Sequence, residues 1–441
     1  ANFSNGVLTF TAPDTTVADL GGDLSTIELI GHNEWKHIRV RVATVNGQTI
    51  TVRNPDGALS QSQFGYELNG IDRFENHIGL VTQPRYWFLD TTSNVLTYYP
   101  LTSEVMEENE ILFPALDTLM VCSNINQNLS FVGLTFADTT WTGTYSPETI
   151  GYYCVQAGIL GNANIPTRNY IPPAAVQVVA SPGIEFQGCT FTRLGAIGLS
   201  LKSGSKGARI IGCKFIDISA HGIMDGDVTH NSDWVGTNTS GAYCYSNLFD
   251  QCGSEFEDCC VYWGYTDGAI LSHNEIVSST WSAISSGWGW GKSNWYAGTA
   301  QPPPPNQGNN IFEYNQIREY GVKLNDRGGI YLNSYMSGTK VRYNSVNTNI
   351  VGVTGPIYLD NGAEGIEIYS NVVFGAAGVY LLLQHFAPPY AVNNHIHDNY
   401  ADSGTINNGF GYDASNDVHD ETIGALPSAA LDIKAAAGRV R

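Results

Sequence analysis

The sequence is poor in charged residues, above all in cations, and contains no long apolar run. Only 14 % of its 441 residues are charged, and 21 Lys and Arg stand against 41 Asp and Glu, a formal net charge of −20. Nucleic acid and anionic membranes are bound by basic faces, so the deficit of cations argues against both partners. No apolar run approaches the ~20 residues of a membrane helix. We therefore expect a soluble protein whose acidity supports solubility.

The sequence also lacks a signal peptide and any cysteine spacing typical of a zinc site. It begins at Ala1, as a mature product would after a leader has been removed. Asn2, Asn128 and Asn238 each begin an Asn-x-Ser/Thr sequon, which favours glycosylation on a secretory route. Eight cysteines fit an oxidising compartment. These features predict a secreted glycoprotein, and the absence of a Cys-x-x-Cys or Cys/His spacing predicts no metal site.

What the sequence has in abundance is repetition. Gly-Gly-Ile-Tyr-Leu at 328–332 recurs 27 residues later as Gly-Pro-Ile-Tyr-Leu at 355–359. A phrase containing Asn or Cys, followed two positions on by Val, Ile or Phe, recurs at Cys189, Cys213, Asn247, Asn274, Asn315, Asn344 and Asn371. A period of about 20–30 residues with short alternating apolar runs predicts stacked β coils. We expect the asparagines to bond one another along the stack, so we assign none of them to catalysis.

Cys189 and Cys213 occupy the same position in adjacent repeats. Their Cα atoms should therefore lie roughly 5 Å apart, the spacing of paired strands. That distance permits a disulfide, and two stacked buried thiols are the equally favoured alternative. Cys259 and Cys260 are neighbours on one predicted strand, so we expect them to face different environments.

The chain divides into three regions by pattern. Residues 1–125 contain alternating runs with Asn46-Gly47 as a hairpin turn, which predicts a small antiparallel β subdomain and a link. Residues 126–425 carry the coils. The Ala-rich tail, 426–441, is expected to form a short capping helix, because a solenoid must hide its open end.

Aligning the repeats on one isoleucine position predicts a carbohydrate-binding strip. Ile223, Val261, Ile284, Ile330 and Ile357 share that position, and the residues that follow them should line one edge of the stack. Those residues include Asp225, Trp263, Trp288, Trp290, Tyr335, Asp360 and, one coil further on, His385. Aromatic rings cover the apolar faces of sugars, and carboxylates accept hydroxyl hydrogen bonds or move protons. The alternative is that the aromatic side chains only cover the edge of the coils.

Four segments resemble a group of right-handed parallel β-helix proteins. They are 86–90 with 96–100 (Tyr-Trp-Phe-Leu-Asp and Leu-Thr-Tyr-Tyr-Pro), 286–291 (Ser-Gly-Trp-Gly-Trp-Gly), 326–331 (Asp-Arg-Gly-Gly-Ile-Tyr) and 357–362 (Ile-Tyr-Leu-Asp-Asn-Gly). The group includes glycoside hydrolases described as α-L-fucosidases and xylanases, and the resemblance runs from about residue 7 to 440. It implies an all-β, right-handed parallel β-helix with an N-terminal antiparallel β subdomain. Members of the group usually begin with further coils, so we also expect a second chain cleaved from an N-terminal segment.

The same resemblance implies that Asp326 and Asp360 are the catalytic acids, with Arg327 beside the first as a substrate ligand. Register conflicts with this pairing. Asp326 precedes Ile330 whereas Asp360 follows Ile357, and seven extended residues would separate the two acids by about 23 Å. Paired glycosidase carboxylates need ~5–10 Å. Either a bend brings them together, or the pair lies on one edge, as Asp360 with an acid across the groove or as Asp326 with Asp258.

Three functions therefore compete. The leading hypothesis is a secreted, cofactor-free glycoside hydrolase that acts on a plant, algal or microbial polysaccharide or oligosaccharide through two carboxylates. The second is a polysaccharide lyase with Lys292 or Arg327 as the basic residue and calcium to neutralise a uronate. The third is a non-catalytic glycan-binding protein that uses the aromatic strip alone.

Overall fold

A computed structural model describes most of the chain. The described residues are 2–4, 7–53, 56, 70–146, 151–156, 158–161, 169–228, 238–291, 307–348, 355–376, 378–386, 388–407 and 411–440. They form two compact units: one of 1–113, 142–155 and 160–165, and one of 114–141, 156–159 and 166–441. Among these residues no helix has the length and apolarity to cross a membrane.

The first unit contains an antiparallel sheet. Its strands, in spatial order, are β1 (Asn2–Ser4), β2 (Val7–Thr11), β5 (Thr49–Val52), β4 (His37–Asn46) and β12 (Tyr152–Gln156), with β3 (Glu28–His32) on β4 and β6 (Gly70–Glu75) on β3. Gly47, at a φ of 57°, makes the tight turn between β4 and β5 that the Asn-Gly pair predicts. Leu29, Val40 and Ile50 are fully buried in the core of this unit. The expected antiparallel β subdomain is confirmed.

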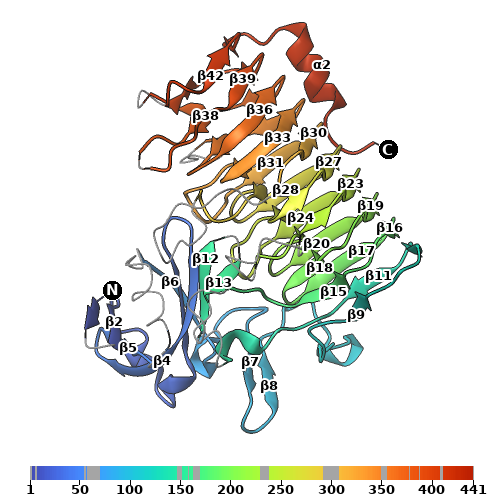
Figure 1. Ribbon diagram of the computed structural model, residues 1–441. Coiled ribbons are helices and arrows are strands. Elements are labelled where there is room, and N and C mark those ends of the chain that lie inside the picture. Colours follow the sequence, from blue (N-terminus) through green and yellow to red (C-terminus); the bar gives the residue numbers. More distant parts are fainter. Residues whose placement is uncertain are drawn as a thin grey trace. The chain divides into compact units, whose positions relative to one another are not determined.

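The second unit is a parallel β-helix made of three ten-stranded sheets (Figure 1). Sheet I comprises β9 (Met120–Ser123), β15 (Ala174–Val179), β18 (Ile197–Lys202), β21 (Ile223–Asp225), β25 (Val261–Trp263), β29 (Ile284–Ser286), β32 (Ile330–Leu332), β35 (Ile357–Leu359), β38 (Val379–Leu383) and β41 (Thr405–Ile406). Sheet II comprises β10 (Leu129–Val132), β16 (Ile184–Gln187), β19 (Arg209–Ile211), β23 (Tyr243–Tyr245), β27 (Ile270–Ser272), β30 (Ile311–Glu313), β33 (Tyr335–Arg342), β36 (Glu364–Tyr369), β39 (His395–His397) and β42 (Asp417–His419). Sheet III comprises β11 (Thr135–Ala137), β17 (Thr190–Leu194), β20 (Lys214–Ile218), β24 (Leu248–Cys252), β28 (Glu275–Ser279), β31 (Gln316–Tyr320), β34 (Ser345–Asn347), β37 (Val372–Phe374), β40 (Tyr400–Ala401) and β43 (Thr422–Ile423). The predicted stacked coils are confirmed.

A ladder of asparagines joins the corners of successive coils, as the repeats predict. The side-chain amides bond head to tail at 2.9–3.0 Å through Asn247, Asn274, Asn315, Asn344, Asn371 and Asn399. Asn399 ends the ladder on the Glu421 carboxylate at 3.0 Å. At a corner the backbone N–H and C=O groups do not pair with a neighbouring strand. The asparagine side chains are their hydrogen-bond partners instead. The asparagines are therefore structural.

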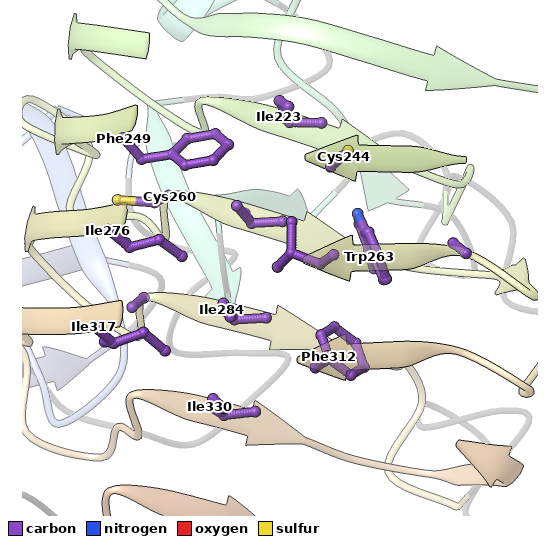
Figure 2. Close-up of a cluster of buried hydrophobic side chains, with 14 of the residues drawn as sticks. Ile223, Cys244, Phe249, Cys260, Trp263, Ile276, Ile284, Phe312, Ile317 and Ile330 are labelled. Atoms are coloured by element: carbon purple, nitrogen blue, oxygen red, sulfur yellow. The ribbon is translucent and has the colours of Figure 1, made fainter. Parts of the chain in front are cut away.

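The core of the solenoid is a stack of like residues from successive coils. Phe191, Phe215 and Phe249 stack face to face with ring centroids 4.6 and 4.9 Å apart. Figure 2 shows the isoleucines of sheet I on the same interior, with Trp263 near Phe312. Each fully buried side chain of this size contributes roughly 1.5–3 kcal/mol.

All eight cysteines are free and buried, so the disulfide that the spacing of Cys189 and Cys213 permits is not formed. The stacked-thiol alternative describes the pair: both lie in the core, and the Cys213 Sγ donates to the Phe186 carbonyl at 3.4 Å. Burial raises the pKa of the Cys213 thiol to about 12, so the sulfur stays protonated. Cys260 enters the core, whereas the Cys259 Sγ contacts the His221 Nδ1 at 3.3 Å.

The C-terminal helix α2 (Ser428–Ala436) lies against the solenoid. The Lys434 ammonium sits 4.1 Å from the centre of the Phe374 ring, and the tail then runs back to earlier coils, where the Gly438 N–H donates to the Tyr314 carbonyl at 2.8 Å. Short helices and strands elsewhere are η1 (Ala18–Leu20), η2 (Leu24–Thr26), η3 (Ile78–Leu80), η4 (Met106–Glu108), η5 (Gly143–Tyr145), β7 (Trp87–Asp90), β8 (Val95–Tyr98), β13 (Ile159–Gly161), β14 (Asn169–Tyr170), β22 (Thr239–Ser240) and β26 (Thr266–Asp267). Of the sequon asparagines, Asn128 is exposed, Asn238 is half-buried, and the side chain of Asn2 lies outside the described part.

Candidate functional site

Tyrosines line the outer face of sheet I at its central coils. In each three-residue strand the first and third residues point into the core, so the middle residue points outward. Register places Tyr262, Ser285, Tyr331 and Tyr358 side by side at this middle position of β25, β29, β32 and β35. The rings of Tyr331 and Tyr358 meet edge to face with centroids 5.1 Å apart. The repeated Ile-Tyr-Leu phrase thus produces a pair of adjacent phenols.

Asp360 follows β35 directly, and its carboxylate accepts hydrogen bonds from both phenols. The Tyr358 hydroxyl donates to Oδ1 at 3.1 Å, and the Tyr331 hydroxyl donates to Oδ2. The Trp290 indole N–H donates to the Tyr331 oxygen at 3.0 Å. Asp360 is only 6 % exposed. Burial raises its pKa above the usual value, and the hydrogen bonds from Tyr331 and other donors lower it in part.

Asp326 is linked to Tyr331 through Trp281. The backbone carbonyl of Asp326 accepts a 2.7 Å hydrogen bond from the Trp281 indole N–H. The centre of the Trp281 ring lies 5.2 Å from that of Tyr331. Burial is the first cause of the raised pKa of Tyr331 and Tyr358, and the charges of Asp360 and Asp326 raise both further. The two acids therefore act electrostatically on one pair of tyrosines.

The chain bends where the extended-strand estimate of the distance between Asp326 and Asp360 assumes that it is straight. The estimate of about 23 Å assumes seven extended residues, whereas β32 and β35 are three residues long and the chain bends at Asn325 and Asp326. The estimated distance of about 23 Å between Asp326 and Asp360 is therefore an upper bound. Which pairing is catalytic, Asp326 with Asp360, Asp360 with an acid across the groove, or Asp326 with Asp258, stays a prediction.

A tight glycine-rich loop after β29 returns two tryptophans to the sheet. Gly287 and Gly289 have φ values of 95° and 92°, a backbone that other residues rarely adopt. The Trp288 and Trp290 rings lie 4.8 Å apart, and Trp288 meets the edge of Tyr262 at 6.5 Å. They are 4 % and 7 % exposed. The Gly-Trp-Gly-Trp-Gly segment thus places aromatic rings beside Asp360, with little of their surface exposed.

Two residues predicted for the strip lie inside the solenoid instead. Trp263 is 0 % exposed, 4.9 Å from Phe312, and Asp225 is paired with it in register and equally buried. The Asp225 carboxylate accepts a 3.2 Å hydrogen bond from Thr266, and burial raises its pKa to about 6. The prediction is wrong for these two residues because a side chain two positions after a core residue, Ile223 or Val261, points the same way as that residue.

The other predicted ligands lie in separate surroundings. The buried Arg327 guanidinium donates to the Leu324 carbonyl and, at 3.2 Å, to the Asn325 side chain of its own turn. Tyr335 is half-buried at the start of β33 in sheet II, and the His385 ring lies 4.5 Å from that of Tyr390. Lys292, the other basic residue considered for a lyase, lies outside the described residues.

A second group of polar residues lies at the start of β25. The His221 ring stacks on Tyr262 with centroids 5.4 Å apart. Asp258 is buried, and neither of its carboxylate oxygens has a hydrogen-bond partner among the described residues. Burial and the charge of Glu257 raise its pKa well above the usual value. Sequence reasoning missed His221 and the phenols. The middle tyrosine of each Ile-Tyr-Leu copy was the signal for Tyr331 and Tyr358.

Chemically, the arrangement is a buried carboxyl group held by two phenols. A carboxyl group whose pKa is raised by burial keeps its proton to higher pH and can donate it. The phenols fix the orientation of this carboxyl group. Such a site suits proton donation to an oxygen leaving group.

Comparisons with known proteins show the fold alone. No protein-family model matches the chain, and no curated protein matches it. A solved structure titled "Glycoside hydrolase" superposes with a TM-score of 0.75 at 20 % identity, covering 99 % of this chain and 74 % of that one. An alginate lyase from Paenibacillus (12 % identity, TM-score 0.29, 57 % and 76 % covered) and a mannuronic acid specific polysaccharide lyase from human gut microbiota (12 %, 0.30, 58 % and 73 %) superpose much less well.

Proposed function

We propose that this protein is a secreted glycoside hydrolase with Asp360 as its general acid and Asp326 as the second carboxylate. The observation that carries the proposal is the buried Asp360 carboxylate, which accepts hydrogen bonds from Tyr331 and Tyr358. The charge of Asp326 raises the pKa of both tyrosines, which supports Asp326 as the second acid. Two carboxyl groups on either side of a glycosidic bond are what hydrolysis requires. The overlay with a structure titled as a glycoside hydrolase supports the proposal by analogy of fold.

In the proposed reaction, Asp360 protonates the glycosidic oxygen as its bond to the anomeric carbon breaks. Asp326 then attacks that carbon as a nucleophile, or removes a proton from the water that does so. Tyr331 and Tyr358 donate hydrogen bonds to the Asp360 carboxylate and stabilise it once its proton has gone. Trp290, in turn, holds the Tyr331 hydroxyl in place.

The test is sugar release from a panel of plant, algal and microbial polysaccharides. Asp360→Asn and Asp326→Asn should each lower kcat by about 10²–10⁴-fold, the usual contribution of a positioned acid or base. Asp432→Asn, on the exposed side of α2, is the matched control and should leave activity unchanged. Full activity in both site variants would rule out the assignment.

The same panel separates a hydrolase from a lyase. A lyase leaves an unsaturated sugar that absorbs ultraviolet light, and its activity would be lost with a chelator if calcium neutralises a uronate. We expect reducing ends to appear without such absorbance and with chelator present. Binding to glycans with no product from any of them would favour the non-catalytic alternative.

A further inference from the structure

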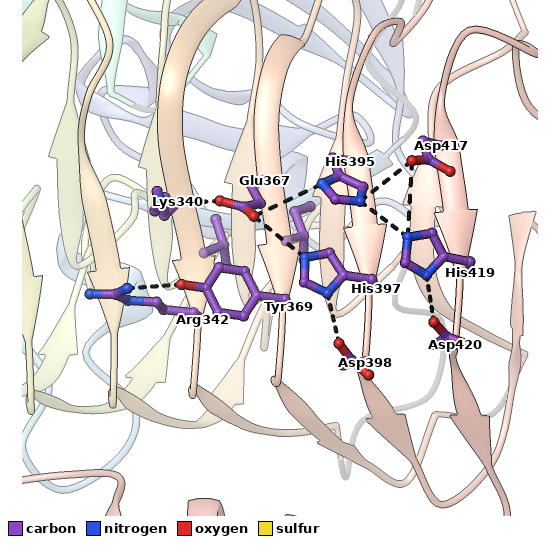
Figure 3. A network of polar contacts seen from close by, with 12 residues as sticks. Lys340, Arg342, Glu367, Tyr369, His395, His397, Asp398, Asp417, His419 and Asp420 are labelled. Atoms are coloured by element: carbon purple, nitrogen blue, oxygen red, sulfur yellow. Dashed lines mark hydrogen bonds and ion pairs between the residues drawn. The ribbon is translucent and has the colours of Figure 1, made fainter.

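Three histidines and a set of carboxylates gather on the outer face of sheet II at its last coils (Figure 3). His395 and His397 lie on β39, and Asp417 and His419 lie on the next strand, β42. Alternate residues of a strand share a face, and Ile396 and Val418, between them, pack on the core side. The four polar side chains therefore point outward together.

Three of their atoms converge as metal ligands do. The His395 Nε2 lies 3.1 Å from the His419 Nε2 and 3.4 Å from the Asp417 Oδ2, and the last two atoms are 3.9 Å apart. Ligands 2.0–2.2 Å from a tetrahedral Zn²⁺ lie roughly 3.3–3.6 Å from one another. The triangle formed by these three atoms is close to one face of such a tetrahedron.

Carboxylates lie near the Nδ1 atoms of His419 and His395, on the opposite side of each ring from the Nε2 atom proposed to bind the metal. The His419 Nδ1 lies 2.8 Å from the Asp420 Oδ2. A proton held on Nδ1 by this carboxylate leaves the lone pair of Nε2 directed at the site, the arrangement of metal-bound histidines in general. The Glu367 Oε1 lies 3.9 Å from the Nδ1 of His395, on the side of that ring away from the three converging atoms.

Ring stacking alone does not explain this geometry. Tyr369, His397 and His419 form an aromatic ladder with centroids 5.1 and 5.5 Å apart, which accounts for the planes of the two histidines. It does not require the His395 Nε2 to face the His419 Nε2, or Asp417 to close the triangle. Two neutral imidazole nitrogens at 3.1 Å need either a shared proton or a common cation.

Local charge favours the cation. Four carboxylates surround the rings, from Glu367, Asp398, Asp417 and Asp420, and the Lys340 ammonium pairs with one of them at 3.1 Å. We propose that His395, Asp417 and His419 form a surface site for Zn²⁺, with water as the fourth ligand. Imidazole with one carboxylate suits zinc, whereas Ca²⁺ and Mg²⁺ prefer oxygen ligands throughout. Bound zinc would join β39 to β42 and so fasten the last two coils.

The test is calorimetric titration of zinc chloride into the whole, EDTA-treated and dialysed protein. We expect about one equivalent to bind at this site, undisturbed by excess Ca²⁺ or Mg²⁺. The His395→Ala/His419→Ala variant should lose it. His32→Ala is the matched control, because His32 is also a surface histidine paired with an aspartate, Asp72, at 2.7 Å. Absence of zinc binding to the unaltered protein, or equal affinity in the double variant, would overturn the proposal.

Two further measurements distinguish loss of the zinc site from loss of the folded structure. Asp420→Ala leaves all three ligands in place and should weaken zinc binding by about 10–100-fold, the usual effect of removing a carboxylate behind a ligating histidine. Unchanged affinity would contradict the role given to Asp420. With Co²⁺ in place of zinc, intense visible absorption typical of tetrahedral coordination should appear in the unaltered protein and in His32→Ala. Its persistence in the double variant would place the metal elsewhere.

Discussion

The hydroxyl of Tyr331 donates a hydrogen bond to the carboxylate of Asp360, which lies 29 residues later and one coil further along the solenoid. Each residue belongs to one copy of the repeated Ile-Tyr-Leu phrase, the first as its central tyrosine and the second as the acid that follows it. Stacking the two copies therefore creates a contact that neither copy could make alone. The proposed catalytic acid depends on this relationship.

Removing the Tyr331 hydroxyl should change the pH dependence of activity. A hydrogen bond to the carboxylate stabilises the charged form and lowers its pKa, so Tyr331→Phe should raise the pKa of Asp360. A general acid is active while protonated, and its activity falls as pH rises through its pKa. We therefore expect the basic limb of the kcat/KM profile to move to higher pH, with a lower maximum rate. A basic limb that stays in place or moves to lower pH would contradict this role.

Trp290→Phe tests the support behind Tyr331. The variant keeps an aromatic ring but loses the N–H that holds the Tyr331 oxygen at 3.0 Å. The loss of one hydrogen bond, about 1 kcal/mol, should lower kcat/KM by about five-fold. The thermal unfolding midpoint serves as the check on folding. Unchanged kcat/KM in a folded variant would show that the indole N–H does not position the phenol.

The buried Asp225 should make the protein less stable as pH rises. Its pKa in the folded state is about 6, above the usual aspartate value of 3.8, so the folded protein binds more protons between these two pH values. The stability that the raised pKa of Asp225 contributes is fully present below the unfolded-state pKa and is lost as pH rises through the folded-state pKa. The difference between the two pKa values corresponds to a loss of roughly 3 kcal/mol in the free energy of unfolding at neutral pH.

Asp225→Asn removes this titration, since the amide carries no charge. We expect the variant to gain stability over the unaltered protein as pH rises from about 4 to about 7, by up to roughly 3 kcal/mol. Chemical unfolding of both proteins across this range measures the effect. A difference between them that does not vary with pH would mean that Asp225 keeps an ordinary pKa.

The asparagine ladder should contribute to stability without affecting catalysis. Asn315→Ala removes the acceptor of two bonds from Asn274 and the donor of two, to the Leu271 carbonyl and the Asn344 side chain, all buried. Unsatisfied buried groups cost about 1–3 kcal/mol each, so we expect a loss of roughly 2–4 kcal/mol. Asn109→Ala, at an exposed position, is the control. A loss under about 0.5 kcal/mol, the size of an ordinary surface substitution, would contradict the structural role.

The repeats determine the fold from the sequence because each coil uses the same residues at the same positions. The ladder from Asn247 to Asn399 and the aligned isoleucines follow directly from the period. The site was harder to predict, because it depends on strand parity and on where strands end. Trp263 and Asp225 were assigned to the outer strip although, two positions after a core residue, they point inward. Tyr331 and Tyr358 were overlooked at the position that does point outward.

Contacts between coils were the other limit. The chain bend at Asn325 and Asp326 is not encoded in the apolar pattern, so register alone gives only an upper bound on the distance between Asp326 and Asp360. His395, Asp417 and His419 come from strands of adjacent coils, and their spacing along the sequence matches no local metal motif. Only the stacking of β39 on β42 brings them together.

The most direct test of the proposed catalytic pair is a crystal structure of the Asp360→Asn variant with a bound oligosaccharide substrate. We predict that the glycosidic oxygen lies within hydrogen-bond distance of the side chain at position 360, with the Asp326 carboxylate facing the anomeric carbon. The expected separation of the two side chains is about 5–10 Å, as in other glycosidases. A sugar bound beside Asp258 and His221, or anywhere out of reach of Asp360, would contradict the assignment.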